Sequence, residues 1–361
     1  MTGTETYVRD LALGLLRRGH TPIVYSPELG EIARELREAT VPVVDDLNDV
    51  AVTPDIIHGN HNPDLMTALL HFPAVPAVFF CHSWTDWLAS PPLHPRILRY
   101  VAVDDTCRDR LECEHAIPER RLRVLLNSVD LERFRPRARL PLRPRRALVF
   151  SNNASEFTHL GAVRQACERA GIELDVVGAG VGAATAKPEL ILGEYDLVFA
   201  KARCALESLA VGAAVILCDR AGSGPLVTTG EVENLRRLNF GLRALSERVD
   251  PDLLLREIAR YDPQDAAEVS RRIRATAGLD ASVDDTLALY GEVIAEYERA
   301  GVEDPLAESR AAAAYIRWLT LQYNEMRADS LVLRLRNRVE RFPLVEKPLR
   351  LLAHVARRAG L

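Results

Sequence analysis

Three polar side chains follow a short apolar stretch at a spacing that suits a phosphorylated sugar. The stretch is residues 197–200, and Lys201, Arg203 and Glu207 come directly after it, at the start of a helix expected to end before Gly212. The free N–H groups and the dipole of a helix start favour an anion there, and the two cations add to that preference. Glu207, one turn further on, can accept hydrogen bonds from hydroxyl groups. The alternative for Glu207 is a buried carboxylate that only caps its neighbours.

Three histidines lie where two other apolar stretches end. His58 and His61 follow residues 54–57, and His82 ends the stretch that begins at Pro76. The two nearer histidines lack the helical i, i+4 spacing and the carboxylate partner of a zinc site. We therefore expect no metal at these residues and a ligand-contacting role instead.

Strands that alternate with helices must position these groups. The apolar runs predict strands at residues 22–25, 41–44, 54–58, 76–82, 99–103, 147–150, 174–177, 197–200 and 213–218. Short apolar runs of this kind, separated by helices, are typical of parallel sheets in doubly wound α/β domains. In such sheets ligands bind beyond the carboxyl ends of the strands, which is where the polar residues lie. A glycine-rich loop is expected after Asp219, and residues 178–182 are expected to form a plain turn, because they lack the spacing of a dinucleotide site.

The composition sets limits on partners and location. The chain has 361 residues, of which 48% are hydrophobic and 27% charged, so it is long enough for two globular cores. A net charge of -5 gives no reason to expect nucleic acid. The six scattered cysteines predict free thiols in a reducing cytoplasm, and no stretch reaches the apolar length of a membrane span.

Five short segments resemble one enzyme family. The sequence ALESLAVGAAVILCD, ending at Asp219, is similar to the nucleotide-sugar segment of GT-B glycosyltransferases of family 4. NSVDLERFRP, which begins at Asn127, resembles that family's domain-crossing signature, with Ser128 in place of a glycine. The N-terminal TGTE, the helix ending in RRGH, and DIIH at residues 55–58 also fit the pattern. The resemblance implies two Rossmann-like domains, residues 1–138 on the acceptor side and 139–300 for the nucleotide sugar, with a helical extension at 301–361.

The resemblance also implies roles for single residues. Glu207 matches the glutamate that binds the donor ribose, and His82 matches a histidine directed at the donor sugar; we expect both in the catalytic centre. Gly3 falls on a turn that approaches the donor phosphate, and Glu5 falls on the acceptor side, as do His58 and His61. A capped surface helix is the alternative for Glu5.

The chain departs from the family at the donor site. A second glutamate of the family is replaced by Phe199, and Ser151, Asn152 and Asn153 replace the loop that carries an arginine and a lysine for the diphosphate. The serine and asparagines can still donate hydrogen bonds, and Lys201 and Arg203 are expected to supply the missing charges. The family's first β-strand, which precedes the turn at Gly3, has no counterpart after Met1. An empty central strand position would leave two rows of backbone groups unpaired, so we expect an upstream segment or another segment to fill it.

The C-terminal extension is basic. Residues 331–361 hold eight Lys or Arg and two Glu, a local charge of +6. This asymmetry predicts an interface: a protein contact, within the chain or across a homodimer through the C-terminal helices, or peripheral contact with an anionic membrane at its inner face. A solvated helix is the alternative. The prolines Pro343 and Pro348 favour the protein contact slightly, because they break the helix.

These features predict a cytoplasmic, metal-independent, retaining glycosyltransferase without a cofactor. Its donor would be a nucleotide diphosphate sugar, and its acceptor a carbohydrate, a lipid-linked sugar or a small molecule. One alternative is a non-catalytic homologue that acts as a regulatory or binding partner. A sugar-phosphate isomerase or epimerase on the same fold is a third reading.

Overall fold

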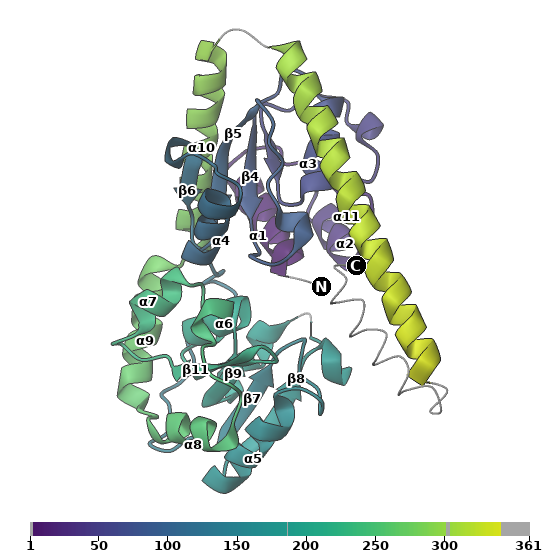
Figure 1. Cartoon of the computed structure of the whole chain (residues 1–361). Coiled ribbons are helices and arrows are strands. Elements are labelled where there is room, and N and C mark those ends of the chain that lie inside the picture. Colours follow the sequence, from purple (N-terminus) through teal and green to yellow (C-terminus); the bar gives the residue numbers. More distant parts are fainter. Residues whose placement is uncertain (1–2, 186, 301–303, 341–361) are drawn as a thin grey trace. The chain divides into compact units, whose positions relative to one another are not determined.

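The computed structural model describes residues 3–185, 187–300 and 304–340, with side chains as far as Arg327. It divides into two units (Figure 1). Unit 1 comprises residues 1–91 and 96–301, and unit 2 comprises residues 92–95 and 302–361. Unit 1 contains two lobes, each built around its own parallel sheet.

The N-terminal lobe holds the first two sheets. Two short strands, β1 and β2, form a two-stranded parallel sheet, and the other four form a parallel sheet in the order β3-β4-β5-β6. Its elements in chain order are α1 (Gly3–Arg17), β1 (Val24–Tyr25), α2 (Glu31–Glu38), β2 (Val43–Val44), η1 (Leu47–Asp49), β3 (Ile57–Gly59), α3 (Asn62–His71), β4 (Ala77–Cys81), η2 (Trp87–Ala89), β5 (Ile97–Ala102), α4 (Asp105–Asp109), η3 (Arg110–Glu114), η4 (Glu119–Arg121) and β6 (Leu122–Val124).

The C-terminal lobe contains a five-stranded sheet in the order β11-β10-β9-β7-β8. The strands are parallel except β11, which runs antiparallel to β10. Its elements are β7 (Arg146–Phe150), α5 (Leu160–Ala170), β8 (Glu173–Val177), η5 (Ala179–Val181), η6 (Pro188–Leu190), η7 (Leu192–Glu194), β9 (Leu197–Ala200), α6 (Ala202–Val211), β10 (Ala214–Asp219), β11 (Gly222–Leu226), α7 (Val232–Arg237), η8 (Leu242–Ala244), α8 (Pro251–Ala259) and α9 (Pro263–Thr276).

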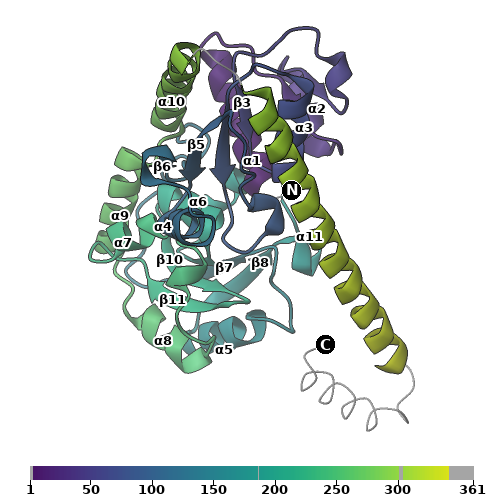
Figure 2. The same ribbon diagram turned by 45° about the horizontal axis from the view of Figure 1, so that its top comes forward.

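Alternate residues of these strands enter two separate cores. Leu148, Val198 and Val215 pack with α6 and α9 on one face, whereas Val149 and Phe199 pack with α5 and α8 on the other. Figure 2 shows α5 and α8 together below the sheet. Both faces are therefore apolar, as the uninterrupted hydrophobic runs of these strands require. The expected glycine-rich loop is partly wrong, because Gly222–Leu226 forms the edge strand β11.

Helix α10 (Leu279–Ala300) follows the C-terminal lobe in sequence but packs on the N-terminal sheet. Leu289, Tyr290 and Val293 bury their side chains against Val78 and Phe80 of β4. The chain therefore crosses twice between the lobes, and at the crossings the Val129 amide donates to Ala277 and the Leu279 amide donates to Val129. The predicted domain ranges, 1–138, 139–300 and 301–361, stay a prediction. Within the second range, α10 is the segment that returns to the N-terminal lobe.

Unit 2 contains α11 (Pro305–Glu340), one continuous helix within the predicted helical extension. Its rings of Tyr315 and Trp318 lie 5.8 Å apart, and Ile316, Leu321 and Tyr323 are exposed. The basic residues from Arg341 onward lie outside the described residues, so the interface prediction for the tail stays open. In the described part of the chain, no helix combines the length and apolar character needed to cross a membrane.

Candidate active site

The C-terminal sheet reverses its strand order at β7. The chain passes from β7 to β8 on one side and then to β9 on the other, so the loops after β7 and β9 diverge from a switch point at the carboxyl ends of these strands. Ser151, Asn152 and Asn153 follow β7, while Lys201 precedes α6 and follows β9. A crevice of this kind is where open α/β sheets bind their ligands.

Asp219, at the end of β10, draws three of these side chains together. Its carboxylate accepts hydrogen bonds from Ser151 Oγ at 2.8 Å and from Asn153 Nδ2 at 3.3 Å, and Lys201 Nζ lies 3.4 Å away. Burial alone would raise the pKa of Asp219, but the Lys201 charge and the two hydrogen bonds lower it below its usual value. The charge of Lys201 is therefore balanced by a buried carboxylate in the unliganded chain.

Asn152 forms hydrogen bonds with the turn after β8 instead of with Asp219. Its Oδ1 accepts a hydrogen bond from the Ala179 amide at 3.1 Å, and its carbonyl accepts one from Gly180 at 3.0 Å. The loop after β7 is thus held against the turn after β8. The two segments lie so close that a Cβ on Gly178 would be 1.9 Å from the Ser151 carbonyl oxygen.

His159 lies near the same cluster, just before α5. It is 1% exposed, and neither ring nitrogen has a hydrogen-bond partner within the described residues. Burial lowers its pKa, while the charge of Asp219 opposes that shift. The imidazole is therefore neutral at neutral pH.

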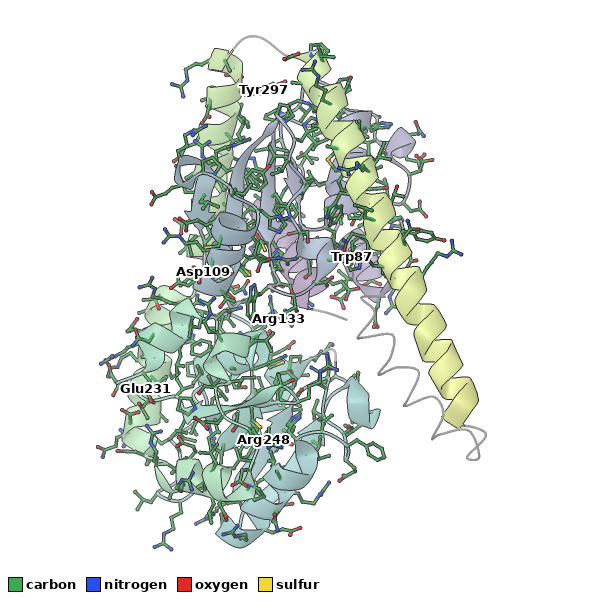
Figure 3. All side chains as sticks on the ribbon, in the orientation of Figure 1. Trp87, Asp109, Arg133, Glu231, Arg248 and Tyr297 are labelled. Atoms are coloured by element: carbon green, nitrogen blue, oxygen red, sulfur yellow. The ribbon has the colours of Figure 1, made fainter. Side chains whose placement is uncertain are left out.

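Arg203 connects the two lobes of unit 1. Its Nε donates to Glu207 Oε1 at 2.7 Å, and its Nη2 donates to Asp10 of α1. Asp10 also pairs with Arg9 at 2.8 Å and lies 3.6 Å from an Nη of Arg133. Arg133 is labelled in Figure 3, between the ribbons of the two lobes. The buried carboxylate of Asp10 thus interacts with three arginines from three separate segments.

Glu207 faces this network from the first turns of α6. It is 5% exposed, and burial raises its pKa even though the neighbouring Arg203 opposes the shift. The i, i+4 spacing places Arg203 and Glu207 on one face of the helix, so the cation predicted to bind phosphate is also the partner of the predicted ribose ligand.

A second polar cluster lies at the carboxyl ends of the N-terminal strands. Asn60 Oδ1 lies 2.8 Å from His82 Nε2 and 3.3 Å from His58 Nε2, while His58 Nδ1 lies 2.6 Å from the Tyr290 hydroxyl. The ring of Tyr7 packs on His82 at 4.6 Å between centroids. His58 and His82 therefore belong to one connected arrangement, which also includes a side chain from α10.

Both histidines are neutral at neutral pH. Burial lowers the pKa of His58 to about 4. Burial lowers the pKa of His82 to about 3, and the charges of His58, His61 and Arg203 add to the effect. A neutral imidazole can donate or accept one hydrogen bond to a hydroxyl group, so His82 suits contact with a sugar better than contact with a phosphate.

The remaining predicted residues lie nearer the surface. Gly3 and Glu5 lie at the exposed start of α1, and His61 Nδ1 lies 3.6 Å from Asp64. Glu5, His58 and His61 all line one cavity of about 260 Å³. The structure thus places the three residues that were predicted on the acceptor side around one cavity. No group of three or more His, Cys, Asp or Glu in the described residues could hold a metal ion.

Comparison with known proteins supports this architecture. Residues 1–133 match the family model described as Glycosyltransferase Family 4. No curated protein matches the chain. A glycosyltransferase from Rickettsia africae superimposes with a TM-score of 0.58 at 14% identity, covering 81% of this chain and 95% of that one. HepE from Anabaena, solved with UDP and glucose, gives a TM-score of 0.55 at 12% identity, covering 80% of this chain and 96% of its own.

The fold is GT-B. The resemblance to GT-B glycosyltransferases of family 4 is thereby confirmed, with the family model covering the N-terminal lobe. At these identities the two solved structures bear on the fold alone.

In this GT-B chain, sequence reasoning missed Asp10, Asn60, Asp219 and Tyr290. The sequence does contain a signal for Asp10, which lies on the apolar face of α1, three positions after Tyr7 and directly before Leu11. A charged residue on the buried face of a helix needs a partner. No comparable signal marks Tyr290, because its contact with His58 spans 232 residues.

Proposed function

We propose that this chain is a glycosyltransferase that takes its donor sugar from a nucleotide diphosphate. The donor binds at the carboxyl ends of β7 and β9, and the acceptor binds beside the histidines of the N-terminal lobe. The observation that carries the proposal is the link from Glu207 through Arg203 to Asp10, which puts the predicted ribose ligand and α1 in one polar network. The family match over residues 1–133 and the GT-B fold support it.

Each group has a task in this reaction. Lys201 and the amides of the first turn of α6 bind the diphosphate, with hydrogen bonds from Ser151 and Asn153. Glu207 accepts hydrogen bonds from the ribose, and neutral His82 contacts the donor sugar. Gly3, at the exposed start of α1, leaves room for the phosphate, and a Cβ there would meet no atom within 4 Å.

The chemistry is a substitution at the anomeric carbon. The bond from this carbon to the diphosphate oxygen breaks, the acceptor hydroxyl oxygen forms the new bond, and the hydroxyl proton leaves with the diphosphate or to solvent. The departing diphosphate gains charge, so donors already fixed at its site lower the barrier without a metal. By analogy with the family, we propose retention of the anomeric configuration.

Nucleotide binding tests the proposal directly. Isothermal titration of the full chain with UDP and with GDP should show one saturable site, and UDP comes first because the HepE structure holds it. Incubation with UDP-sugars and a panel of acceptors should then release UDP. A chain that binds neither nucleotide is not a transferase of this kind.

Glu207→Gln is the sharpest single change at this site. It keeps the size of the side chain but removes the charge, and hydrogen bonds to charged groups contribute about 1.5–3 kcal/mol, so nucleotide affinity should fall roughly 10-fold to 150-fold. Glu189→Gln is the matched control, because Glu189 pairs with Arg133 at 3.0 Å and lies outside the proposed donor site. Equal affinity of folded Glu207→Gln and parent would remove Glu207 from the site.

A non-catalytic GT-B homologue is the second candidate. Lys201 and Arg203 are each paired with buried carboxylates, which lowers the positive charge offered to a diphosphate. Phe199, which stands where the family has a glutamate, is 0% exposed within β9 and cannot touch a ligand. This candidate predicts no binding of either nucleotide, so the same titration separates the two.

A further inference from the structure

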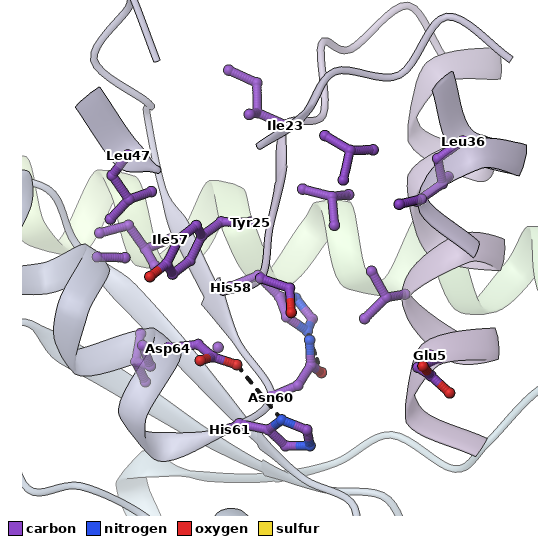
Figure 4. A pocket seen from close by; sticks show the side chains of 18 of the residues that line it. Glu5, Ile23, Tyr25, Leu36, Leu47, Ile57, His58, Asn60, His61 and Asp64 are labelled. Carbon is purple, nitrogen blue, oxygen red and sulfur yellow. Dashed lines mark hydrogen bonds and ion pairs between the residues drawn. The ribbon is translucent and has the colours of Figure 1, made fainter. Parts of the chain in front are cut away.

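A row of four polar side chains connects α10 with the residue that follows β4. The Tyr290 hydroxyl lies 2.6 Å from His58 Nδ1. Asn60 Oδ1 lies 3.3 Å from His58 Nε2 and 2.8 Å from His82 Nε2. Figure 4 shows the His58 ring and the Asn60 side chain facing each other. Each neutral imidazole carries one proton, so the position of one proton in this row constrains the others.

The Tyr290 hydroxyl sets the first proton. Tyr290 is 8% exposed, and His58 Nδ1 is the sole hydrogen-bond partner of its hydroxyl group among the described residues. A buried donor that lacks an acceptor is costly, so the hydroxyl group donates its hydrogen to His58 Nδ1. This nitrogen therefore carries no proton, and the one proton of the His58 ring lies on Nε2.

The proton on His58 Nε2 determines the state of His82. His58 Nε2 donates to Asn60 Oδ1, and the second lone pair of this oxygen accepts a hydrogen bond from His82 Nε2. The proton of His82 therefore also lies on Nε2, and Nδ1 keeps its lone pair. His82 is partly exposed, and its Nδ1 has no hydrogen-bond partner in the described part of the chain. An acceptor nitrogen is thus left for a ligand.

The opposite arrangement of the protons is less favourable. With the Asn60 amide turned over, its NH2 group would donate to Nε2 of both histidines, and both rings would carry their proton on Nδ1. The Tyr290 hydroxyl would then accept from His58, and its own hydrogen would find no acceptor within the part of the chain that the structure describes. The two arrangements differ at His82 Nδ1, which is an acceptor in the first and a donor in the second.

We infer that Tyr290 and Asn60 are positioning residues for His82. Through His58 they hold the His82 proton on Nε2, so that Nδ1 accepts a hydrogen bond from a hydroxyl group of the donor sugar. The inference rests on the proposed contact between His82 and that sugar. Such an acceptor binds a free hydroxyl group but forms no hydrogen bond with a phosphate oxygen, an ether oxygen or a carbon that lacks the hydroxyl group. The row therefore selects an unsubstituted sugar hydroxyl.

NMR of the full chain, labelled with nitrogen-15 at histidine, reads the tautomers directly, and His82→Gln assigns the signals of His82. We expect His82 Nδ1 at the chemical shift of a nitrogen without a proton and Nε2 at that of a nitrogen with one. Tyr290→Phe removes only the hydroxyl group, so both tautomers of His82 should then be populated. Tyr261→Phe is the matched control, because its hydroxyl donates to the Pro141 carbonyl at 3.0 Å in the C-terminal lobe. A parent His82 with its proton on Nδ1, or an unchanged tautomer in Tyr290→Phe, would overturn the inference.

Changes at Asn60 test the link between the two rings. Asn60→Asp keeps an acceptor oxygen between them and should keep the parent tautomer of His82. Asn60→Leu has a similar size but no acceptor, so both tautomers of His82 should be populated. Equal spectra for these two variants would show that Asn60 does not position His82.

Donor binding tests the consequence for the sugar. Tyr290→Phe should bind UDP as the parent does, because UDP lacks the sugar. The UDP-sugar that the parent binds most tightly should bind about 2-fold to 12-fold more weakly, which is the range of one neutral hydrogen bond. Unchanged binding of the UDP-sugar, or equal weakening for UDP and UDP-sugar, would overturn the contact. A parent that binds no UDP would refute the proposed function and with it the sugar contact, whereas the NMR spectra decide the positions of the protons by themselves.

Discussion

At the residue scale, Asp10 pairs with three arginines, of which Arg133 and Arg203 are distant in sequence and Arg9 is its direct neighbour. The contact of Arg203 with Asp10 spans 193 residues and crosses from α6 to α1. The side chains of Arg203, Glu207 and Asp10 are 17%, 7% and 6% exposed, whereas that of Arg133 is 28% exposed. Buried ion pairs contribute little net stability, yet removal of one partner leaves an uncompensated charge.

Replacing Arg203 should therefore lower the free energy of unfolding more than replacing Lys201. Arg203→Ala leaves Glu207 and Asp10 without a shared partner, and we expect a loss of about 3–5 kcal/mol in the free energy of unfolding. Lys201→Ala leaves Asp219 with its hydrogen bonds from Ser151 and Asn153, so its loss should be smaller.

For variants that fold, we expect Lys201→Ala to lower nucleotide affinity more than Arg203→Ala does. Lys201→Ala removes a charge-assisted bond of about 1.5–3 kcal/mol and should lower UDP affinity at least about tenfold. Urea unfolding and isothermal titration measure the two effects separately. If Lys201→Ala binds UDP as the parent does, Lys201 is only a partner of Asp219.

The buried histidines should make the fold sensitive to acid. The pKa of His58 is about 4 in the fold, against a usual value of 6.5, so between these values the unfolded chain binds more protons than the native chain. The stability that neutral His58 contributes is complete above pH 6.5 and falls as the pH is lowered toward 4. At about 1.4 kcal/mol per pKa unit, the loss is on the order of 3 kcal/mol.

Urea midpoints measured across this pH range give the test. His58→Gln should flatten the slope, because glutamine does not titrate, while His71→Gln, at the exposed end of α3, should leave it unchanged. The absolute stability of the two variants does not matter, since only the slope is compared. An unchanged slope for His58→Gln would show that His58 titrates normally.

At the element scale, two loops at the end of the C-terminal sheet fit together with no space between them. The turn after β8 approaches the loop after β7 so closely that Gly178 and Gly180 leave no room for a Cβ, which would meet the carbonyl oxygens of Ser151 and Ala154. The Ser151 side chain in turn binds Asp219. The turn after β8 thereby sets the position of the loop after β7, which we propose to bind the donor.

Gly178→Ala should destabilise the chain by about 2–4 kcal/mol, because its methyl group forces the two backbones apart. Gly161→Ala is the control: Gly161 lies in α5, its Cβ would meet nothing within 4 Å, and the change should stabilise the helix by about 0.5–1 kcal/mol. Thermal unfolding gives both values. Nucleotide affinity should fall for Gly178→Ala alone.

At the scale of the whole molecule, the long helix α11 of unit 2 carries exposed apolar residues. Leu306, Ile316 and Tyr323 of α11 are 58%, 59% and 55% exposed, and the basic tail follows them in sequence. Exposed apolar side chains on a helix of this length favour a partner. A second copy of the chain and an anionic membrane remain the two predicted partners.

Sedimentation and liposome flotation distinguish these partners. We expect the full chain to sediment as a dimer at both low and high salt, and a chain ending at Gly301 to sediment as a monomer, because burial of apolar residues tolerates salt. Flotation of a monomer with anionic liposomes, lost at high salt and lost on truncation, would instead favour the membrane.

The sequence by itself determined the elements, the parallel sheets and the GT-B fold, because these follow from local periodicity and from short motifs. Residues 197–200 form β9 as expected, and Gly212 ends α6 with a φ of +98°. The strand Gly222–Leu226 was not predicted, because a segment rich in glycine becomes a strand only when β10 supplies its hydrogen bonds.

The tertiary structure alone decided how the polar groups pair. Lys201, Arg203 and Glu207 were all found from their spacing, but their partners Asp219 and Asp10 come from other segments. Ion pairs and hydrogen bonds depend on distances of a few ångströms between side chains, and local sequence holds no record of such distances when the segments are far apart.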